Sequence, residues 1–131
     1  MATVTPDNLG KAVGEVLQTF AHSVETSVDA SAIETGKKTA QILKKTSPVK
    51  KYGKNAGKYA KGWSTKKTKK GEVYVYNKTD YNLTHLLEYG HRVVSHGKDT
   101  GKKTRANPHI ASAEQFAQKE FVDSVTLKIQ H

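Results

Sequence analysis

The sequence predicts an α+β fold in which a long N-terminal helix and a C-terminal helix pack on a small antiparallel β-sheet, with a basic flexible loop between the first helix and the sheet. Apolar residues recur at steps of three and four in both terminal segments, which is the spacing of one helix face. The middle of the chain alternates valine with tyrosine, as a half-buried strand does. The length of 131 residues suits a single domain over residues 1–131.

The first predicted element is a helix over residues 6–45. Thr5 is suited to cap it and Pro6 to occupy its first position. The apolar stripe thins in its second half, where the capping-box pattern "SAIE" allows a kink near residues 29–36. The helix is expected to end at "TSP", because a residue that precedes proline is disfavoured in helical geometry. A helix of this length on so small a domain needs a partner surface. Its apolar stripe comprises Leu9, Val13, Val16, Phe20, Val24 and Val28.

A basic loop is predicted over residues 46–58, followed by a β-hairpin over residues 59–78. The loop is rich in glycine and lysine, and Lys70-Gly71 is a suitable turn for the hairpin. In the second strand, alternation places the valines on one face and the tyrosines on the other. Tyrosines interleaved with lysines either cover a half-buried sheet or stack on single-stranded nucleic acid. The alternating residues are Val73, Tyr74, Val75 and Tyr76.

A short helix is predicted over residues 82–89. Either Asp80 or Asn82 can cap it, and Gly90 can end it. Its apolar face would consist of Leu83, Leu86 and Leu87.

The rest of the chain is predicted to be a loop followed by a helix. Residues 91–107 are polar and contain glycine, which indicates a loop, although "RVV" at its start could form a further strand. The last helix is predicted over residues 108–128, with Asn107 as its cap and Pro108 in its first position. Its buried stripe would comprise Ile110, Ala113, Ala117, Phe121 and Val125.

The net charge of +10 comes from one segment of the chain. Residues 1–35 carry five acids and one lysine, residues 36–71 carry thirteen lysines and no acid, and residues 72–131 are nearly balanced. This pattern indicates either a polyanionic partner or a solvated basic loop. Because only two of the 22 basic residues are arginine, any contact with nucleic acid would be a non-specific contact with phosphate groups.

Several classes of function are disfavoured by composition. The chain has no cysteine, which excludes disulfide bonds and thiolate metal sites. No apolar run approaches the ~20 residues needed to span a bilayer, so no membrane partner is expected. The N-terminus does not resemble a signal peptide, and we expect synthesis in the cytoplasm. The sequence contains no nucleophile elbow, phosphate-binding loop or dinucleotide fingerprint, so we predict no enzyme, no catalytic residue and no cofactor.

The stretch "YNLTHLLEYGHRV" is the strongest candidate for chemistry. Glu88 and three of the four nearby histidines could supply carboxylate and imidazole ligands to zinc; these histidines are His85, His91, His96 and His109. Helical zinc sites place two histidines four residues apart, whereas the first two here are six apart with a glycine between them. In the alternative interpretation, His85 and His109 form hydrogen bonds with backbone or tyrosine near the core, and His91 caps helix carbonyls. We therefore predict no metal ligand.

Three blocks of sequence resemble a family of small structural proteins of phages with long, non-contractile tails (siphophages). The blocks are "SPVKKYG…GKYAKGW" at 47–63, "VYVYNKTDYNLTHLLEYGH" at 73–91 and "NPHIASAEQ" at 107–115. Proteins of this family are encoded among head–tail joining genes and are called tail-completion, neck or minor head–tail proteins. The resemblance rests most on Leu83, Thr84, His85, Leu86, Leu87, Glu88, Tyr89, Gly90, His91, Pro108, His109 and Ile110.

The resemblance implies a ring of six copies in the virion, at the junction between the connector stack of the head and the tail tube. Its partners would be connector or stopper proteins, tail-tube or tail-terminator proteins and, without sequence specificity, genomic double-stranded DNA. The roles of tail terminator and connector stopper remain alternatives, as does a non-specific DNA-binding protein. The candidates to line a DNA channel are Lys50, Lys51, Lys54, Lys58 and Lys61.

Overall fold

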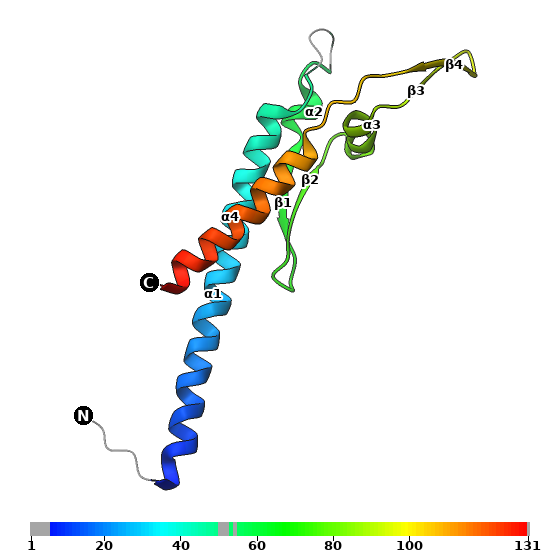
Figure 1. Ribbon diagram of the computed structural model, residues 1–131. Helices are drawn as coiled ribbons and strands as arrows, with labels where there is room; N and C mark the ends of the chain where they lie inside the picture. Colours follow the sequence, from blue (N-terminus) through cyan, green and yellow to red (C-terminus); the bar gives the residue numbers. More distant parts are fainter. Residues whose placement is uncertain (1–5, 50–52, 54, 131) are drawn as a thin grey trace.

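The computed structural model describes residues 6–49, 53 and 55–130, and it confirms the predicted α+β fold (Figure 1). In this part of the chain, the strands form two antiparallel sheets of two strands each, where one sheet was predicted. In order, the elements are α1 (Pro6–Thr46), α2 (Lys58–Lys61), β1 (Trp63–Lys67), β2 (Val73–Asn77), the 3₁₀ turn η1 (Tyr81–Leu83), α3 (Thr84–Tyr89), β3 (Arg92–Ser95), β4 (Lys98–Lys103) and α4 (Ile110–Gln130).

Helix α1 is continuous over 41 residues, so the prediction of a kink near residues 29–36 is wrong. The apolar stripe thins there because small residues allow close packing. Ser31 is buried and accepts a hydrogen bond from the Ser124 hydroxyl of α4 at 2.9 Å. Gly36 lies so close to β2 that an added Cβ would stand 2.8 Å from Val73 Cγ1. Thr5, the predicted cap, lies outside the described residues.

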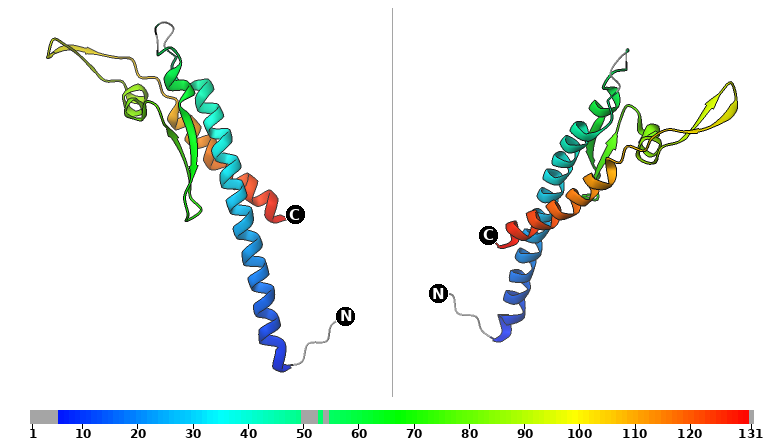
Figure 2. Two further views of the ribbon diagram at one scale, coloured as in Figure 1. Left: turned by 180° about the vertical axis from the view of Figure 1, so that it is seen from behind. Right: turned by 45° about the horizontal axis from the view of Figure 1, so that its top comes forward.

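The C-terminal half of α1 is the centre of the packing. Helix α4 lies along it, and the β1–β2 hairpin packs on the same half (Figure 1, Figure 2). Exposed ion pairs join α1 to α4, with Lys38 Nζ 2.6 Å from Glu120 Oε1 and Lys128 Nζ 2.9 Å from Glu34 Oε2. Such exposed pairs contribute little to stability, so apolar packing holds the helices together. The core comprises Ala40, Leu43, Tyr59, Trp63 and Ala113, with Ile42, Val75, Leu87 and Ile110 at its edge.

The β1–β2 hairpin confirms two predictions. The chain turns at Lys70-Gly71, where Gly71 has a φ of 84° that glycine adopts without strain. Val73 and Val75 face α1 and are half-buried, whereas the two tyrosines of β2 are exposed. The strands pair from Trp63 opposite Asn77 to Lys67 opposite Val73.

The prediction that the first strand begins at residue 59 is wrong, because residues 58–61 form the helical turn α2. Gly57 begins this turn with a φ of 73°. The turn buries Tyr59 and Ala60 together, whereas a strand would point two successive side chains to opposite faces.

Residues 91–107, predicted as a loop, contain the β3–β4 hairpin. The alternative of a strand at "RVV" is confirmed by β3, whereas β4 was not predicted. His96 and Gly97, the two central residues of the turn, have φ values of 50° and 77°. A turn with positive φ at both central residues matches the twist of the strands in a tight hairpin. This hairpin extends away from the helices (Figure 1), and every residue of β4 is exposed. Helix α4 begins at Ile110, two residues after its predicted start, and extends to Gln130.

The N-terminal half of α1, here called the rod (residues 8–28), extends beyond the rest of the protein (Figure 1, Figure 2). The predicted stripe lies on it but is largely uncovered. Its large apolar side chains between residues 9 and 20 are 49% to 68% exposed. That so long a helix needs a partner surface stays a prediction. These side chains are Leu9, Val13, Val16, Leu17 and Phe20.

Candidate functional site

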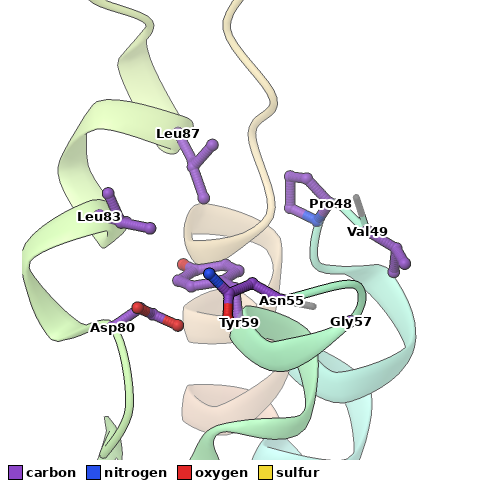
Figure 3. A pocket seen from close by; sticks show the side chains of 8 residues that line it. All are labelled: Pro48, Val49, Asn55, Gly57, Tyr59, Asp80, Leu83 and Leu87. Carbon is purple, nitrogen blue, oxygen red and sulfur yellow. The ribbon is translucent and has the colours of Figure 1, made fainter. Parts of the chain in front are cut away.

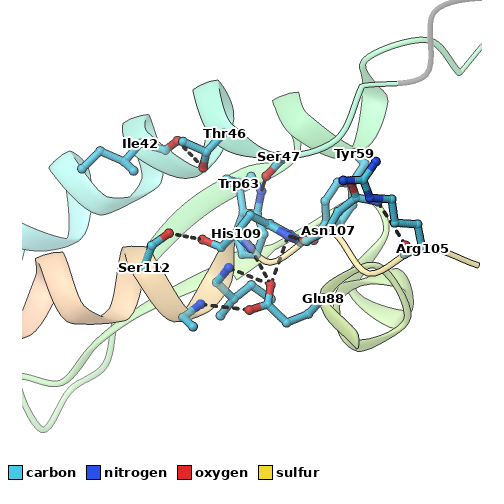
Figure 4. A network of polar contacts seen from close by, with 12 residues as sticks. Ile42, Thr46, Ser47, Tyr59, Trp63, Glu88, Arg105, Asn107, His109 and Ser112 are labelled. Atoms are coloured by element: carbon cyan, nitrogen blue, oxygen red, sulfur yellow. Dashed lines mark hydrogen bonds and ion pairs between the residues drawn. The ribbon is translucent and has the colours of Figure 1, made fainter. Parts of the chain in front are cut away.

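The candidate site is a buried polar network at the N-terminus of α4, shown in Figure 4. Glu88, near the end of α3, reaches the first backbone amides of α4. Its Oε2 accepts hydrogen bonds from the N–H groups of His109 at 2.7 Å and Ile110 at 2.8 Å, and its Oε1 accepts one from Ala111 at 3.1 Å. The first N–H groups of a helix lack partners within it, and the helix dipole attracts negative charge there. Glu88 therefore caps α4 and fixes α3 against it.

The environment of Glu88 keeps its carboxyl group ionised. Burial by itself raises the pKa of Glu88, but the hydrogen bonds from the three amides and the nearby His109 ring together outweigh burial. The pKa of Glu88 consequently lies below its ordinary value of 4.5. A carboxylate held in this way is an ionised cap at neutral pH and a poor proton donor.

His109 joins the capped end of α4 to Tyr59 of α2. Its Nδ1 lies 2.6 Å from the backbone oxygen of Asn107, which can only accept, so Nδ1 carries the proton. Its Nε2 lies 2.8 Å from the Tyr59 hydroxyl oxygen, and in the neutral ring it accepts the hydrogen bond from that hydroxyl. Burial, followed by the charges of Glu88 and Asp80, raises the pKa of Tyr59 to about 12, so the hydroxyl keeps its proton. The prediction that His109 bonds to a tyrosine near the core is confirmed.

The network has the character of a structural joint. The rings of Tyr59 and Trp63 meet the His109 ring edge to face, with centroids 5.7 Å and 6.4 Å from it. The Trp63 indole N–H donates to Ser47 Oγ at 2.7 Å, which ties the end of α1 to the same cluster. A general base must reach the proton it abstracts, but His109 is 1% exposed and both its nitrogens are engaged. The chemistry available here is therefore to hold α1, α2, α3 and α4 in one arrangement.

Replacing Tyr59 with phenylalanine should lower the free energy of unfolding by about 1–2 kcal/mol, because the buried Nε2 of His109 loses its donor. Urea denaturation measures the change, and the exposed Tyr81→Phe serves as a control that should alter stability by less than about 0.5 kcal/mol. Because the pKa of Tyr59 is raised from 10.0 to about 12, its contribution is complete below pH 10 and is lost as the pH rises toward 12. A Tyr59→Phe protein with the alkaline stability profile of the wild type would contradict this account.

A second buried network, which we did not predict, surrounds Asn77 at the end of β2. Its Nδ2 donates to the backbone oxygen of Tyr59 at 2.7 Å. Its Oδ1 accepts from the Thr79 amide at 3.2 Å, the Thr79 hydroxyl at 3.0 Å and the Asp80 amide at 2.9 Å. The sequence signal was present, because asparagine followed by polar residues at the end of a strand favours such a side-chain turn. Asn77 thus fixes the course of the chain from the hairpin to η1.

The remaining histidines of the motif do not join the network. His85 and His96 are exposed, and His91 pairs with Thr104, whose backbone N–H donates to the His91 carbonyl at 2.8 Å. The His91 ring Nδ1 lies 3.2 Å from Thr104 Oγ1, so the prediction that His91 caps helix carbonyls is wrong. The prediction that His85 lies near the core is wrong as well, because His85 is exposed. Glycine is required at position 90 for two reasons. A Cβ there would lie 2.5 Å from the Thr104 carbonyl oxygen, and the φ of 76° is one that residues with a side chain rarely adopt. Among the residues that the structure describes, no group of three or more histidine, aspartate or glutamate side chains could hold a metal ion.

The predicted channel lysines are only partly described. Lys58 and Lys61 are exposed on α2, and Lys58 Nζ lies 3.8 Å from Asp80 Oδ1. Lys50, Lys51 and Lys54 lie outside the described residues. Beside α2 is a pocket of about 420 Å³, which the sequence did not indicate (Figure 3). It is lined by Pro48, Val49, Asn55, Gly57, Tyr59, Asp80, Leu83 and Leu87, so part of the leucine face of the motif borders it.

Comparison with protein-family models, with curated proteins and with solved structures gave no significant match for this chain. Within the described residues, no helix combines the length and the apolar character that crossing a membrane requires.

Proposed function

We propose that this protein is a structural subunit of the head–tail junction of a phage with a long, non-contractile tail. Copies of it would form a ring that joins the DNA-filled head to the tail tube. The observation that carries the proposal is the uncovered apolar face of the rod, on a helix whose other half packs in the core of the protein. Contiguous exposed apolar surface marks a protein–protein interface. The head–tail junction is named as the assembly because residues 47–63, 73–91 and 107–115 resemble neck and tail-completion proteins.

The residues that carry this resemblance support a structural role. Glu88 caps α4, Gly90 provides a turn that a side chain would obstruct, and His109 is held through both ring nitrogens. Together they fix α3 against α4 and use their polar groups internally. A ring closes only if the interface on each side of the subunit keeps one relative orientation, so a rigid corner between two elements suits such a subunit.

Non-specific DNA binding is the second candidate, and the exposed lysines of the β1–β2 hairpin and α2 favour it. Within a ring, the same lysines would serve the passage of DNA, because lysine contacts with phosphates carry no sequence preference and weaken with salt. A DNA-binding protein acting outside a virion would bind duplex with a steep salt dependence. A ring subunit would bind free duplex weakly and would be present in purified particles.

Electron microscopy of particles assembled without this protein tests the proposal. The expected result is DNA-filled heads and finished tails that remain separate. Tails of uncontrolled length would identify a terminator instead, and heads that lose their DNA would identify a connector stopper. Intact, infectious particles would overturn the proposal, as would absence of the protein from purified virions by mass spectrometry.

A further inference from the structure

An apolar groove lies open between α4 and the β1–β2 hairpin. Its volume is about 330 Å³, its floor is α1, and its two walls are β2 and α4. Small residues form the floor, so the walls stand above it and leave room for bulky side chains. A groove of this form suits the apolar face of a helix. It is lined by Ala32, Thr35, Gly36, Thr39, Val73, Val75, Ala117, Gln118 and Phe121.

The rod carries a surface of the complementary kind. Its exposed apolar side chains follow steps of three and four residues and therefore lie along one side of the helix. The rod cannot fill the groove of its own chain, because the floor of that groove is a later part of the same continuous helix. A rod that fills the groove must therefore come from another molecule.

Charge favours a second copy of this chain, with its rod in the groove. The rod (residues 8–28) contains two acids and one lysine, a net charge of −1, whereas residues 63–77 of the hairpin contain four lysines and one acid, a net charge of +3. Two rods side by side would gain no attraction from their net charges, which have the same sign. A rod beside the lysine-rich hairpin that borders the groove would be attracted to it.

We propose that the rod of each copy docks into the groove between α4 and β2 of the next copy. The contact is head-to-tail, since each copy offers one rod and one groove, and such a contact generates a ring when its rotation closes. This inference rests on the proposed function for its setting, but it concerns which surfaces meet. It can therefore be tested on the purified protein.

Cross-linking is well suited to the test, because the natural chain has no cysteine to give a background. Val16→Cys places a thiol on the apolar side of the rod, and Ala117→Cys places one in the groove. The two full-length proteins are mixed and treated with a short bismaleimide linker. Gln18→Cys is the matched rod control, because it is exposed two positions along and thus on the opposite side of α1. Gln118→Cys is a second groove position, exposed and therefore tolerant of change.

The expected result is a cross-linked dimer of Val16→Cys with Ala117→Cys or Gln118→Cys, and loss of that product with Gln18→Cys. A protein that carries both Val16→Glu and Ala117→Cys should no longer associate with itself, because a charge replaces the apolar side chain of the rod. Cross-linking of Val16→Cys with itself would show rod-to-rod pairing and would overturn the inference, as would no cross-link from either groove position when circular dichroism shows folded proteins. Cross-linking of a protein that is absent from virions would leave the inference standing and remove the proposed function.

Discussion

Replacing Glu88 with alanine is expected to lower the free energy of unfolding by about 3 kcal/mol. The change leaves three amide N–H groups at the start of α4 without their acceptor, in a place where Glu88 and His109 are both buried. It also removes a negative charge from the positive end of the helix dipole. Urea or thermal denaturation followed by circular dichroism measures the loss. Glu114→Ala, an exposed glutamate on α4, is the control and should change stability by less than about 0.5 kcal/mol.

The contribution of Glu88 should also depend on pH with a definite sign. Because folding lowers the pKa of Glu88, its contribution is complete above the ordinary value of 4.5 and is lost as the pH falls through the pKa of the folded state. Glu88→Gln, which keeps the shape but not the charge, should be less stable than the wild type at neutral pH. The difference between the two proteins should shrink in acid. A constant difference from pH 7 to pH 3 would mean that the carboxylate charge does not stabilise α4.

Asn77→Ala is the second substitution with a large expected effect, a loss of about 2–4 kcal/mol. The side chain is 2% exposed, and removing it leaves the amides of Thr79 and Asp80 without their acceptor. It also takes one of two donors from the Tyr59 carbonyl, which keeps the hydrogen bond from the Gly62 N–H at 3.1 Å. Chemical denaturation measures the loss. Asn82→Ala, an exposed asparagine in η1, is the matched control. Equal stability of the two variants would show that water replaces the Asn77 amide without cost.

The sequence predicted those parts of the fold whose cause is local. The spacing of apolar residues predicted α1 and α4, and Lys70-Gly71 predicted the first hairpin turn, because each depends on neighbours in the chain. His96-Gly97 was an equally local turn signal, which we missed because the residues around it are polar. The α2 turn was mistaken for a strand, since burial of Tyr59 beside Ala60 depends on distant partners.

The candidate site was predictable in its residues but less so in its geometry. The sequence predicted that His109 forms a hydrogen bond with backbone or tyrosine near the core, and His109 does bond to a tyrosine. That the partner is Tyr59, and that Glu88 rather than Asn107 caps α4, follows from packing between segments 21 to 50 residues apart. No local pattern contains that information. The open groove between α4 and β2 likewise exists only once three elements have been brought together.

Gly10 and Gly14 give the rod a further property. An added Cβ at either position would meet nothing within 4 Å, so close packing within one copy does not require them. Each glycine weakens a helix by about 1 kcal/mol relative to alanine. In a single subunit the rod should therefore unwind and reform while the body stays folded. In the proposed head-to-tail contact, docking would have to offset the entropy cost of ordering this segment, which would lower the affinity between copies in dilute solution. The proposed assembly would consequently need a higher protein concentration to begin, and it would be favoured where copies of the chain are already gathered.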